Sequence, residues 1–222
     1  MHRRVDSHQQ APQTTGQTVQ RWAHLYDAVV GLVALGKERD IREMTAQMAG
    51  LKPSDKVLDV GCGTGSLAIA TKARVGATGE VYGIDASPEM VDVARRKASQ
   101  IGVDIAFQVG LIEDIPFPDC TFDVVLSSMM LHHLPGDDLK HQGFAEMQRV
   151  LKPGGSLWIV DIEPPASPLL RVLHPILLVH FWVKTRLQDY QAVMEATGFT
   201  EIEVGKTRYG GLAFIRGKAS KS

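Results

Sequence analysis

A glycine-rich stretch near residue 60 is the first candidate for chemistry in this sequence. Residues 61–66 read GCGTGS, and they follow the apolar run VLDV at 57–60. Glycines are unfavourable inside helices and strands, so three of them within five residues predict a turn that a ligand can approach closely. The spacing fits the dinucleotide fingerprint G-x-G-x-x-G poorly because Ser66 stands at its sixth position, and no Lys-Ser or Lys-Thr pair follows as in a P-loop. Taken alone, the cluster could also be a plain turn.

An acidic residue stands at the spacing expected of a ribose-binding carboxylate. Asp85 lies twenty residues after Gly65, at the end of the run EVYGID. A carboxylate at the end of a second strand can accept hydrogen bonds from both hydroxyls of a ribose. The glycine turn and this acid therefore predict a nucleoside ligand, and the missing phosphate-binding pattern indicates a nucleoside without phosphates. The alternative is that Asp85 only stabilises the start of the following helix through the helix dipole.

Two adjacent histidines are the candidates for proton transfer. His132 and His133 follow a predicted strand at 121–128, and imidazole is the side chain that titrates nearest to neutral pH. We select His133 as the candidate catalytic residue. The alternative is that both histidines cap or pack a short helical turn. His174 and His180 are too isolated in the sequence to predict a metal site, so no metal is expected.

Strands and helices alternate along most of the chain. Ser87 is the expected N-cap of a helix with Pro88 at its first position, and LKPGG predicts a turn at 151–155. This alternation predicts an α/β fold with a doubly wound, mostly parallel sheet, which binds ligands at the carboxyl ends of its strands. The last two strands are expected to form a hairpin around YGG, after a helix that Gly198 ends. The predicted strands are 57–60, 80–85, 105–109, 121–128, 156–161, 201–204 and 212–216, and the predicted helices are 19–35, 38–48, 65–74, 87–101, 137–150 and 187–197.

Four blocks of sequence carry a family resemblance. They are LDVGCGTG, GIDASPEM, IEDIPFPDCTFDVVLSSMMLHHL and RVLKPGG, in this order. Together they resemble class I S-adenosylmethionine-dependent methyltransferases, most of all the small-molecule branch typified by ubiquinone/menaquinone C-methyltransferases. The resemblance covers about residues 26–198. It implies a Rossmann-like sheet of seven strands with a late antiparallel strand, N-terminal helices, S-adenosylmethionine as cofactor and S-adenosylhomocysteine as product.

The resemblance also implies roles for single residues. Asp59 and the backbone of residues 61–65 would hold the methionine end of the cofactor, and Asp85 would hold the ribose. Leu111 is a departure, because the family often has an acid there and leucine cannot accept a hydrogen bond from the adenine amino group. The full implied cofactor set is Asp59, Gly61, Cys62, Gly63, Gly65, Asp85, Ala86, Met90, Ile112, Glu113, Ser127 and Met129.

Two segments outside the predicted core would determine the substrate. Tyr26 lies in a helical cap expected at 17–50 and would close over the methionine end or pack against the core. Residues 163–186 form an unusually long apolar connection that contains His174 and His180. This connection predicts a lid over an apolar or aromatic substrate, with a dimer contact or a core-packed helix as alternatives. The first of these alternatives would make the protein a homodimer.

Composition limits the other functions. The 222 residues carry a formal net charge of −1, so nothing favours nucleic-acid binding. Two cysteines give no disulfide framework, and no stretch is long enough for a membrane span, so we expect a cytoplasmic protein. The expected organisation is a polar, disordered tail at 1–16 and a single methyltransferase domain at 17–222. The expected reaction is in-line methyl transfer to a small molecule; the alternatives are a nicotinamide-dependent oxidoreductase and a non-catalytic protein that binds S-adenosylmethionine.

Overall fold

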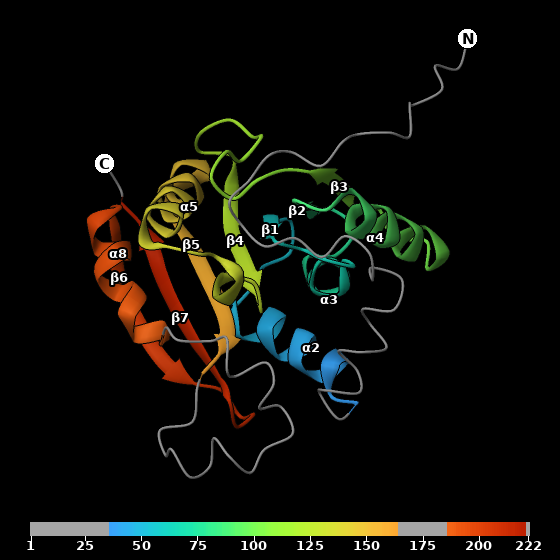
Figure 1. The fold of residues 1–222 in the computed structure, drawn as a ribbon. Helices are drawn as coiled ribbons and strands as arrows, with labels where there is room; N and C mark the ends of the chain where they lie inside the picture. Colours follow the sequence, from blue (N-terminus) through green and yellow to red (C-terminus); the bar gives the residue numbers. More distant parts are fainter. Residues whose placement is uncertain (1–35, 164–185, 221–222) are drawn as a thin grey trace.

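A seven-stranded sheet crosses the molecule (Figure 1). The computed structural model describes residues 36–163 and 186–220, and the strand order within them is β3-β2-β1-β4-β5-β7-β6. Neighbouring strands from β3 to β5 pair in parallel, whereas β7 is antiparallel to both β5 and β6. The predicted fold class, a doubly wound sheet with a late antiparallel strand, is therefore confirmed. The strands are β1 (Lys56–Val60), β2 (Glu80–Asp85), β3 (Ala106–Val109), β4 (Phe122–Ser128), β5 (Leu151–Ile162), β6 (Phe199–Lys206) and β7 (Leu212–Ala219).

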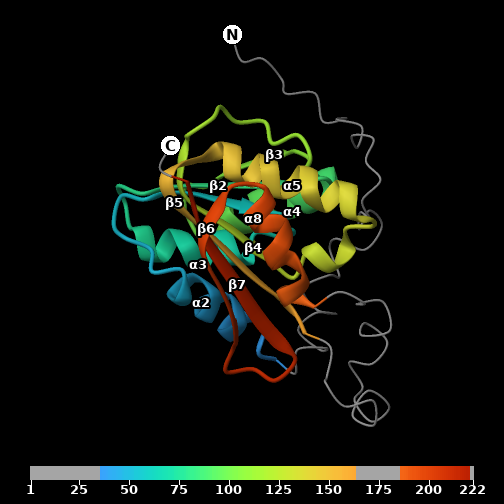
Figure 2. The ribbon, with the colours of Figure 1, turned by 90° about the vertical axis from the view of Figure 1, so that its left-hand side faces the viewer.

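Helices cover both faces of this sheet (Figure 1 and Figure 2). One buried layer joins the strands to α2 (Glu38–Met48), α3 (Ser66–Val75) and α4 (Pro88–Gln100). The other joins them to α5 (Asp137–Val150) and α8 (Gln191–Ala196). Two 3-10 turns, η1 (Leu131–His133) and η2 (Leu187–Tyr190), connect the elements of the second half. Within the described residues both faces of the central strands are thus covered, which leaves the ends of these strands for a ligand.

Buried apolar runs and a well-formed cap explain how the first two strands are placed. Val57 and Leu58 are fully buried and pack in opposite layers, as successive residues of a central strand must. Ser87 begins α4 as predicted, since its hydroxyl oxygen accepts a hydrogen bond from the Met90 amide at 3.2 Å. This cap fixes the start of α4 directly after Asp85, the last residue of β2.

The expected turn at 151–155 is wrong. β5 already begins at Leu151, which pairs with Phe122, and the register then shifts so that Val124 pairs with Ser156. Gly154, with a φ of +76°, lies inside this irregular stretch. Extra residues in one strand of a pair form a bulge. Residues 152–155 are such extra residues, so β5 keeps its pairing with β4 on both sides of them and no separate turn forms.

The C-terminal elements follow the prediction with changed lengths. The predicted helix at 187–197 is divided into η2 and the short α8, and it ends before Gly198, whose φ is +92°. The predicted hairpin is confirmed, since β6 and β7 pair antiparallel, and both strands are longer than expected. The predicted helix at 38–48 is α2.

Several predictions fall outside the described residues. These are the tail at 1–16, the helix at 19–35 with Tyr26, and residues 164–185 of the predicted lid with His174 and His180. The division of the chain into a tail, a cap and an inserted segment stays a prediction. Among the helices of the two described segments, none combines the length and the apolar character needed to cross a membrane.

Candidate active site

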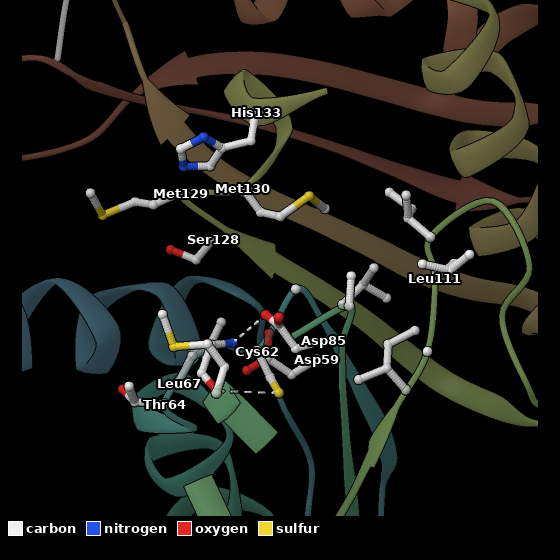
Figure 3. Close-up of a pocket in the computed structure, with 18 of the residues that line it drawn as sticks. Asp59, Cys62, Thr64, Leu67, Asp85, Leu111, Ser128, Met129, Met130 and His133 are labelled. Atoms are coloured by element: carbon white, nitrogen blue, oxygen red, sulfur yellow. Dashed lines mark hydrogen bonds between the residues drawn. The ribbon is translucent and has the colours of Figure 1, made fainter. Parts of the chain in front are cut away.

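A cavity opens at the carboxyl ends of β1, β2 and β4 (Figure 3). Asp59 comes from β1, Asp85 ends β2 and Ser128 ends β4. Doubly wound sheets bind their ligands at this edge. The cavity brings together most of the predicted set, because Asp59, Gly61, Cys62, Gly63, Asp85, Ala86, Met90, Ile112, Glu113, Met129 and His133 all line it.

Ser127 lies in the core instead of the cavity. Its side chain is fully buried, and its hydroxyl donates to the carbonyl oxygen of Val60 at 2.9 Å. The following residue, Ser128, lines the cavity. Successive side chains of a strand point to opposite faces, so a difference of one residue exchanges a core position for a cavity position.

The three glycines of the turn have different neighbours. A Cβ at Gly61 would overlap the side chain of Met130. A Cβ at Gly65, which does not line the cavity, would lie 2.8 Å from the ring of Phe107. A Cβ at Gly63 would meet no protein atom within 4 Å, although its φ of +52° still favours glycine. Gly63 is therefore the position of the three at which the turn faces open space in the cavity.

Asp85 is held by backbone amides. The Gly63 amide donates to Oδ2 at 2.9 Å, and the Ser87 amide donates to Oδ1 at 2.9 Å. Burial raises the pKa of Asp85, and these two N–H donors oppose that rise. Each carboxylate oxygen has a further lone pair for a ligand. The glycine turn and the carboxylate thus form one prearranged unit.

Asp59 has no such support for one of its oxygens. The residue is 1% exposed, and within the described residues its Oδ2 has no hydrogen-bond partner. Burial raises the pKa of Asp59 to about 7; the charge of Arg42 opposes the rise, the charge of Asp85 adds to it, and the Ala68 amide opposes it. A buried carboxylate oxygen without a donor is costly, so this site favours a ligand that supplies a positive donor.

Arg42 reaches the cavity from α2 and was not anticipated from the sequence. Its Nη1 donates to the hydroxyl of Ser128 at 2.8 Å, and its Nε donates to Glu38 at 3.2 Å. The arginine is only 9% exposed. In the sequence, Glu38 and Arg42 look like an ordinary surface pair four residues apart on a helix. The contact with Ser128 spans 86 residues, so no local pattern indicates it.

The two histidines of η1 take different positions. The side chain of His132 is 8% exposed, and its Nδ1 lies 2.7 Å from Oδ1 of Asp161 on β5. Its backbone amide donates to the other oxygen of Asp161 at 3.2 Å. The two imidazole rings pack with their centroids 4.0 Å apart, and His133 lines the cavity. Burial, followed by the charge of His132, lowers the pKa of His133 to about 4, against the opposing charge of Asp161. His133 therefore presents a neutral imidazole at neutral pH.

Comparisons with known proteins identify the family. Residues 57–155 match the profile of a family described as "Methyltransferase domain". A demethylmenaquinone methyltransferase of Deinococcus radiodurans is 36% identical over 172 residues, which are 76% of this chain and 70% of that protein. The chain belongs to the class I S-adenosylmethionine-dependent methyltransferases.

Other relatives of this methyltransferase agree with that assignment. A ubiquinone/menaquinone biosynthesis C-methyltransferase of Laribacter hongkongensis is 37% identical over 147 residues, which are 66% of this chain and 59% of that protein. The chain thus spans less than two thirds of the length of this relative. A crystal structure of an S-adenosylmethionine-dependent methyltransferase from Aquifex aeolicus has the same fold, with a TM-score of 0.68 and 24% identity over 87% of this chain and 97% of that one.

Family membership explains why no phosphate-binding pattern is present in this methyltransferase. S-adenosylmethionine, the cofactor of the family, is a nucleoside joined to an amino acid, and it has no phosphate. The nicotinamide-dependent alternative is therefore not favoured. The cavity is also lined by residues outside the predicted set: Arg42, Val60, Thr64, Ser66, Leu67, Ile84, Gly110, Leu111, Ser128, Met130 and Leu134. Thr64 and Ser66 stand within or next to the glycine turn, so the motif itself could have indicated them.

Proposed function

We propose that this methyltransferase transfers a methyl group from S-adenosylmethionine to a ring carbon of an aromatic, quinol-type small molecule. The observation that carries the proposal is the division of one cavity into two parts. The part at β1 and β2 holds the two carboxylates Asp59 and Asp85, and the part after β4 holds an apolar wall with His133. The first part suits a charged nucleoside cofactor, and the second suits an apolar acceptor.

The residues of the first part fit the cofactor. Asp85 would accept hydrogen bonds from the two ribose hydroxyls, because its carboxylate is already oriented by the Gly63 and Ser87 amides. Asp59, with its unpartnered oxygen, would face the methionine end. Gly63 leaves room for the ligand between them.

The adenine end would lie against apolar side chains. Met90, Leu111 and Ile112 line the cavity beyond Asp85, where Ala86 and Glu113 also contribute. Leu111 offers no side-chain acceptor for the adenine amino group, so recognition there depends on stacking against apolar groups and on neighbouring polar atoms. The adenine should consequently contribute less to specificity than the ribose.

The residues of the second part fit an apolar ring. Met129 and Met130 follow β4, and Leu134 follows η1. Met129 has a left-handed backbone with a φ of +56°, and its amide donates to the Val160 carbonyl at 2.8 Å, which fixes this unusual conformation at the cavity. The names of the relatives support a quinone-type acceptor, since one is a ubiquinone/menaquinone biosynthesis C-methyltransferase and another a demethylmenaquinone methyltransferase.

His133 would orient the acceptor. When bound, S-adenosylmethionine supplies an electrophilic methyl group. A ring carbon of the acceptor would take this methyl group by in-line displacement as the S–CH3 bond breaks and S-adenosylhomocysteine leaves, and the same carbon would then lose its proton to solvent. A neutral imidazole can accept a hydrogen bond from a ring hydroxyl of the acceptor, which raises electron density in the ring and fixes its orientation. With a pKa of about 4, His133 keeps this ability throughout the neutral range.

The proposed function is tested with methyl-labelled S-adenosylmethionine and four acceptors: a short-chain naphthoquinol, a phenol, an aliphatic amine and a thiol. Label on a ring carbon of the naphthoquinol is the expected result. Label on only the amine or the thiol would contradict the proposal. Binding of S-adenosylhomocysteine without transfer to any acceptor would favour a non-catalytic binding protein. His133→Ala should lower kcat by about tenfold, the value of one hydrogen bond, without changing affinity for S-adenosylhomocysteine.

A further inference from the structure

One wall of the cavity is a connection with little secondary structure of its own. Residues 110–119, here called the β3–β4 loop, follow β3 and form no helix or strand apart from an isolated bridge between Leu111 and Asp114. Leu111 lines the cavity from this loop (Figure 3), and so do Ile112 and Glu113. Backbone groups that no helix or sheet satisfies need other partners. The shape of this wall therefore depends on what holds the loop.

Two side chains of α5 supply such partners. The Ile115 amide donates to Oε2 of Glu146 at 2.8 Å, and the Ile115 carbonyl oxygen accepts from Nη2 of Arg149 at 2.9 Å. The Phe117 carbonyl oxygen accepts from Nη1 of Arg149, also at 2.9 Å. Three backbone groups of the loop are thus bonded to side chains that lie 31 to 34 residues later in the chain.

Arg149 uses its whole guanidinium in this arrangement. A guanidinium has five N–H donors. Besides the two carbonyl contacts, Nε and Nη2 donate to the two oxygens of Glu146, both at 2.7 Å, and Nη1 donates to Asp119 at 2.7 Å. The hydrogen bond from Arg149, opposed by burial, lowers the pKa of Glu146. Only a planar fork can reach all of these acceptors at once, so a lysine could not replace this arginine.

The same helix also holds the loop by close packing. A Cβ at Gly143 of α5 would lie 2.8 Å from the side chain of Ile112. Ile112 is buried and lines the cavity, and Ile115 is 2% exposed. α5 therefore fixes the loop at Ile112 by packing and at Ile115 by hydrogen bonds.

We propose that Glu146 and Arg149 are positioning residues for the adenine end of the cofactor. They hold the β3–β4 loop in the shape in which Leu111 lies against the base, although neither side chain lines the cavity. The proposal rests on the placement of the cofactor under the proposed function, and it adds two residues outside the cavity to those that determine cofactor affinity. The competing explanation is that the pair only stabilises the fold.

A double-mutant cycle on the affinity for S-adenosylhomocysteine separates these explanations. Wild type, Arg149→Lys, Leu111→Ala and the double variant are titrated as full chains by calorimetry, at a temperature at which all four are folded. Arg149→Lys keeps the charge but loses the fork, so it should weaken binding by about tenfold. Leu111→Ala removes an apolar contact with the base and should weaken binding by about fivefold. A displaced loop has already lost the Leu111 contact, so the double variant should bind within about twofold of Arg149→Lys.

Arg216→Lys is the matched control. Arg216 of β7 also pairs with a glutamate, Glu203 of the neighbouring β6, and it does not line the cavity. The two arginine side chains have similar exposure, 43% for Arg216 and 31% for Arg149. Arg216→Lys should leave the affinity for S-adenosylhomocysteine unchanged. An equal loss of affinity in both Arg→Lys variants would show a general loosening of the fold, and the proposal would be withdrawn.

The remaining outcomes are also decisive. Wild-type affinity in Arg149→Lys, or a double variant in which the two single effects multiply, would overturn the proposal and leave the cofactor placement intact. No effect of Leu111→Ala would separate the adenine from this loop and overturn the proposal as well. If wild type does not bind S-adenosylhomocysteine, the proposed function fails too. If the cycle behaves as expected but no acceptor is methylated, only the proposed function fails. Should Arg149→Lys not fold, Glu146→Gln takes its place in the cycle with the same expectations, because it removes the charge that the fork binds.

Discussion

Asp85, the last residue of β2, and Asp59, the last but one of the neighbouring β1, line the same cavity but differ in their hydrogen-bond partners. Both have a pKa raised by burial. Asp85 receives one backbone amide on each oxygen, at 2.9 Å in both cases. Within the described residues one oxygen of Asp59 has no donor, and Arg42, whose charge acts on Asp59, makes its hydrogen bonds to Glu38 and Ser128. In the proposed placement of the cofactor, the site for the nucleoside is therefore complete before the ligand binds, whereas the site for the amino-acid end is completed by the ligand.

The difference separates a carboxylate that is held rigidly, Asp85, from a carboxylate whose burial costs folding free energy, Asp59. A preorganised carboxylate loses little freedom when a ribose binds, so its hydrogen bonds contribute to affinity in full. An unpartnered buried carboxylate destabilises the free protein, and a ligand that supplies an ammonium relieves that cost. The two acids should accordingly respond in opposite ways to the same substitutions.

The largest effect is expected at the turn that supports Asp85. Gly63→Val places a side chain in the open space of the cavity at a backbone φ of +52°. Calorimetry should detect no binding of S-adenosylhomocysteine, a loss of about a hundredfold or more, with a smaller effect on thermal unfolding. Unchanged affinity would mean that the ligand does not approach this turn.

Gly65→Val is the contrast to that variant within the same turn. Its side chain would meet Phe107 and Ala94, which lie in the core and not in the cavity. We expect overpacking and backbone strain to lower the free energy of unfolding by about 1–3 kcal/mol or more, measured by denaturant unfolding. A variant that loses only ligand affinity would contradict this separation of roles.

Amidation of the two acids should have opposite effects on stability. Asp85→Asn leaves one of the Gly63 and Ser87 amides facing an NH2 group, which should lower the free energy of unfolding by about 1–3 kcal/mol. Asp59→Asn removes a buried charge and should make the ligand-free protein more stable than wild type at pH 8. Denaturant unfolding of both variants at that pH measures the difference, and destabilisation by both to the same extent would refute the comparison.

The same contrast predicts a pH dependence. The pKa of Asp59 rises from 3.8 to about 7 on folding, so the folded protein holds this proton more tightly. Its contribution to stability is fully present below pH 3.8 and is lost as the pH rises through 7. From pH 5 to pH 8, wild type should lose roughly 2–3 kcal/mol relative to Asp59→Asn. A constant difference between the two proteins would show that Asp59 does not titrate in this range.

Ligand affinity should show a smaller pH effect of the opposite direction. The ammonium of S-adenosylhomocysteine requires ionised Asp59, so its affinity should rise by roughly tenfold between pH 6 and pH 8. 5′-Methylthioadenosine lacks the ammonium but keeps the ribose, so any pH dependence of its affinity measures the titration of Asp85 and can be subtracted. If both ligands gain equally, Asp59 is not the group responsible.

The sequence predicted those features of the fold and the site that depend on residues close together in the chain. The alternation of strands and helices gave the sheet, Ser87 with Pro88 gave the start of α4, and the spacing from Gly65 to Asp85 placed the acid at the glycine turn. Parts that depend on distant contacts were not predictable. The sequence has no signal for Arg42 meeting Ser128, nor for which of two adjacent serines faces the cavity.

The error at residues 151–155 has the same origin. Pro and two glycines after a helix indicate a turn on local grounds. Pairing with β4 extends the strand through them, and the extra length is absorbed in a bulge. The local sequence thus indicated an irregular backbone at residues 151–155, whereas pairing with β4 placed this irregular stretch inside β5.

The most direct test of the account is the affinity of Asp85→Ala for S-adenosylhomocysteine, measured by calorimetry beside wild type and Glu80→Ala. Glu80 begins the strand that Asp85 ends, and its side chain is 58% exposed, so it is the matched control. Charge-assisted hydrogen bonds contribute about 1.5–3 kcal/mol each, so Asp85→Ala should bind at least tenfold more weakly, while Glu80→Ala should bind as wild type does. Wild-type affinity in Asp85→Ala would contradict the assignment of this strand end to the ribose, and with it the account of the cavity.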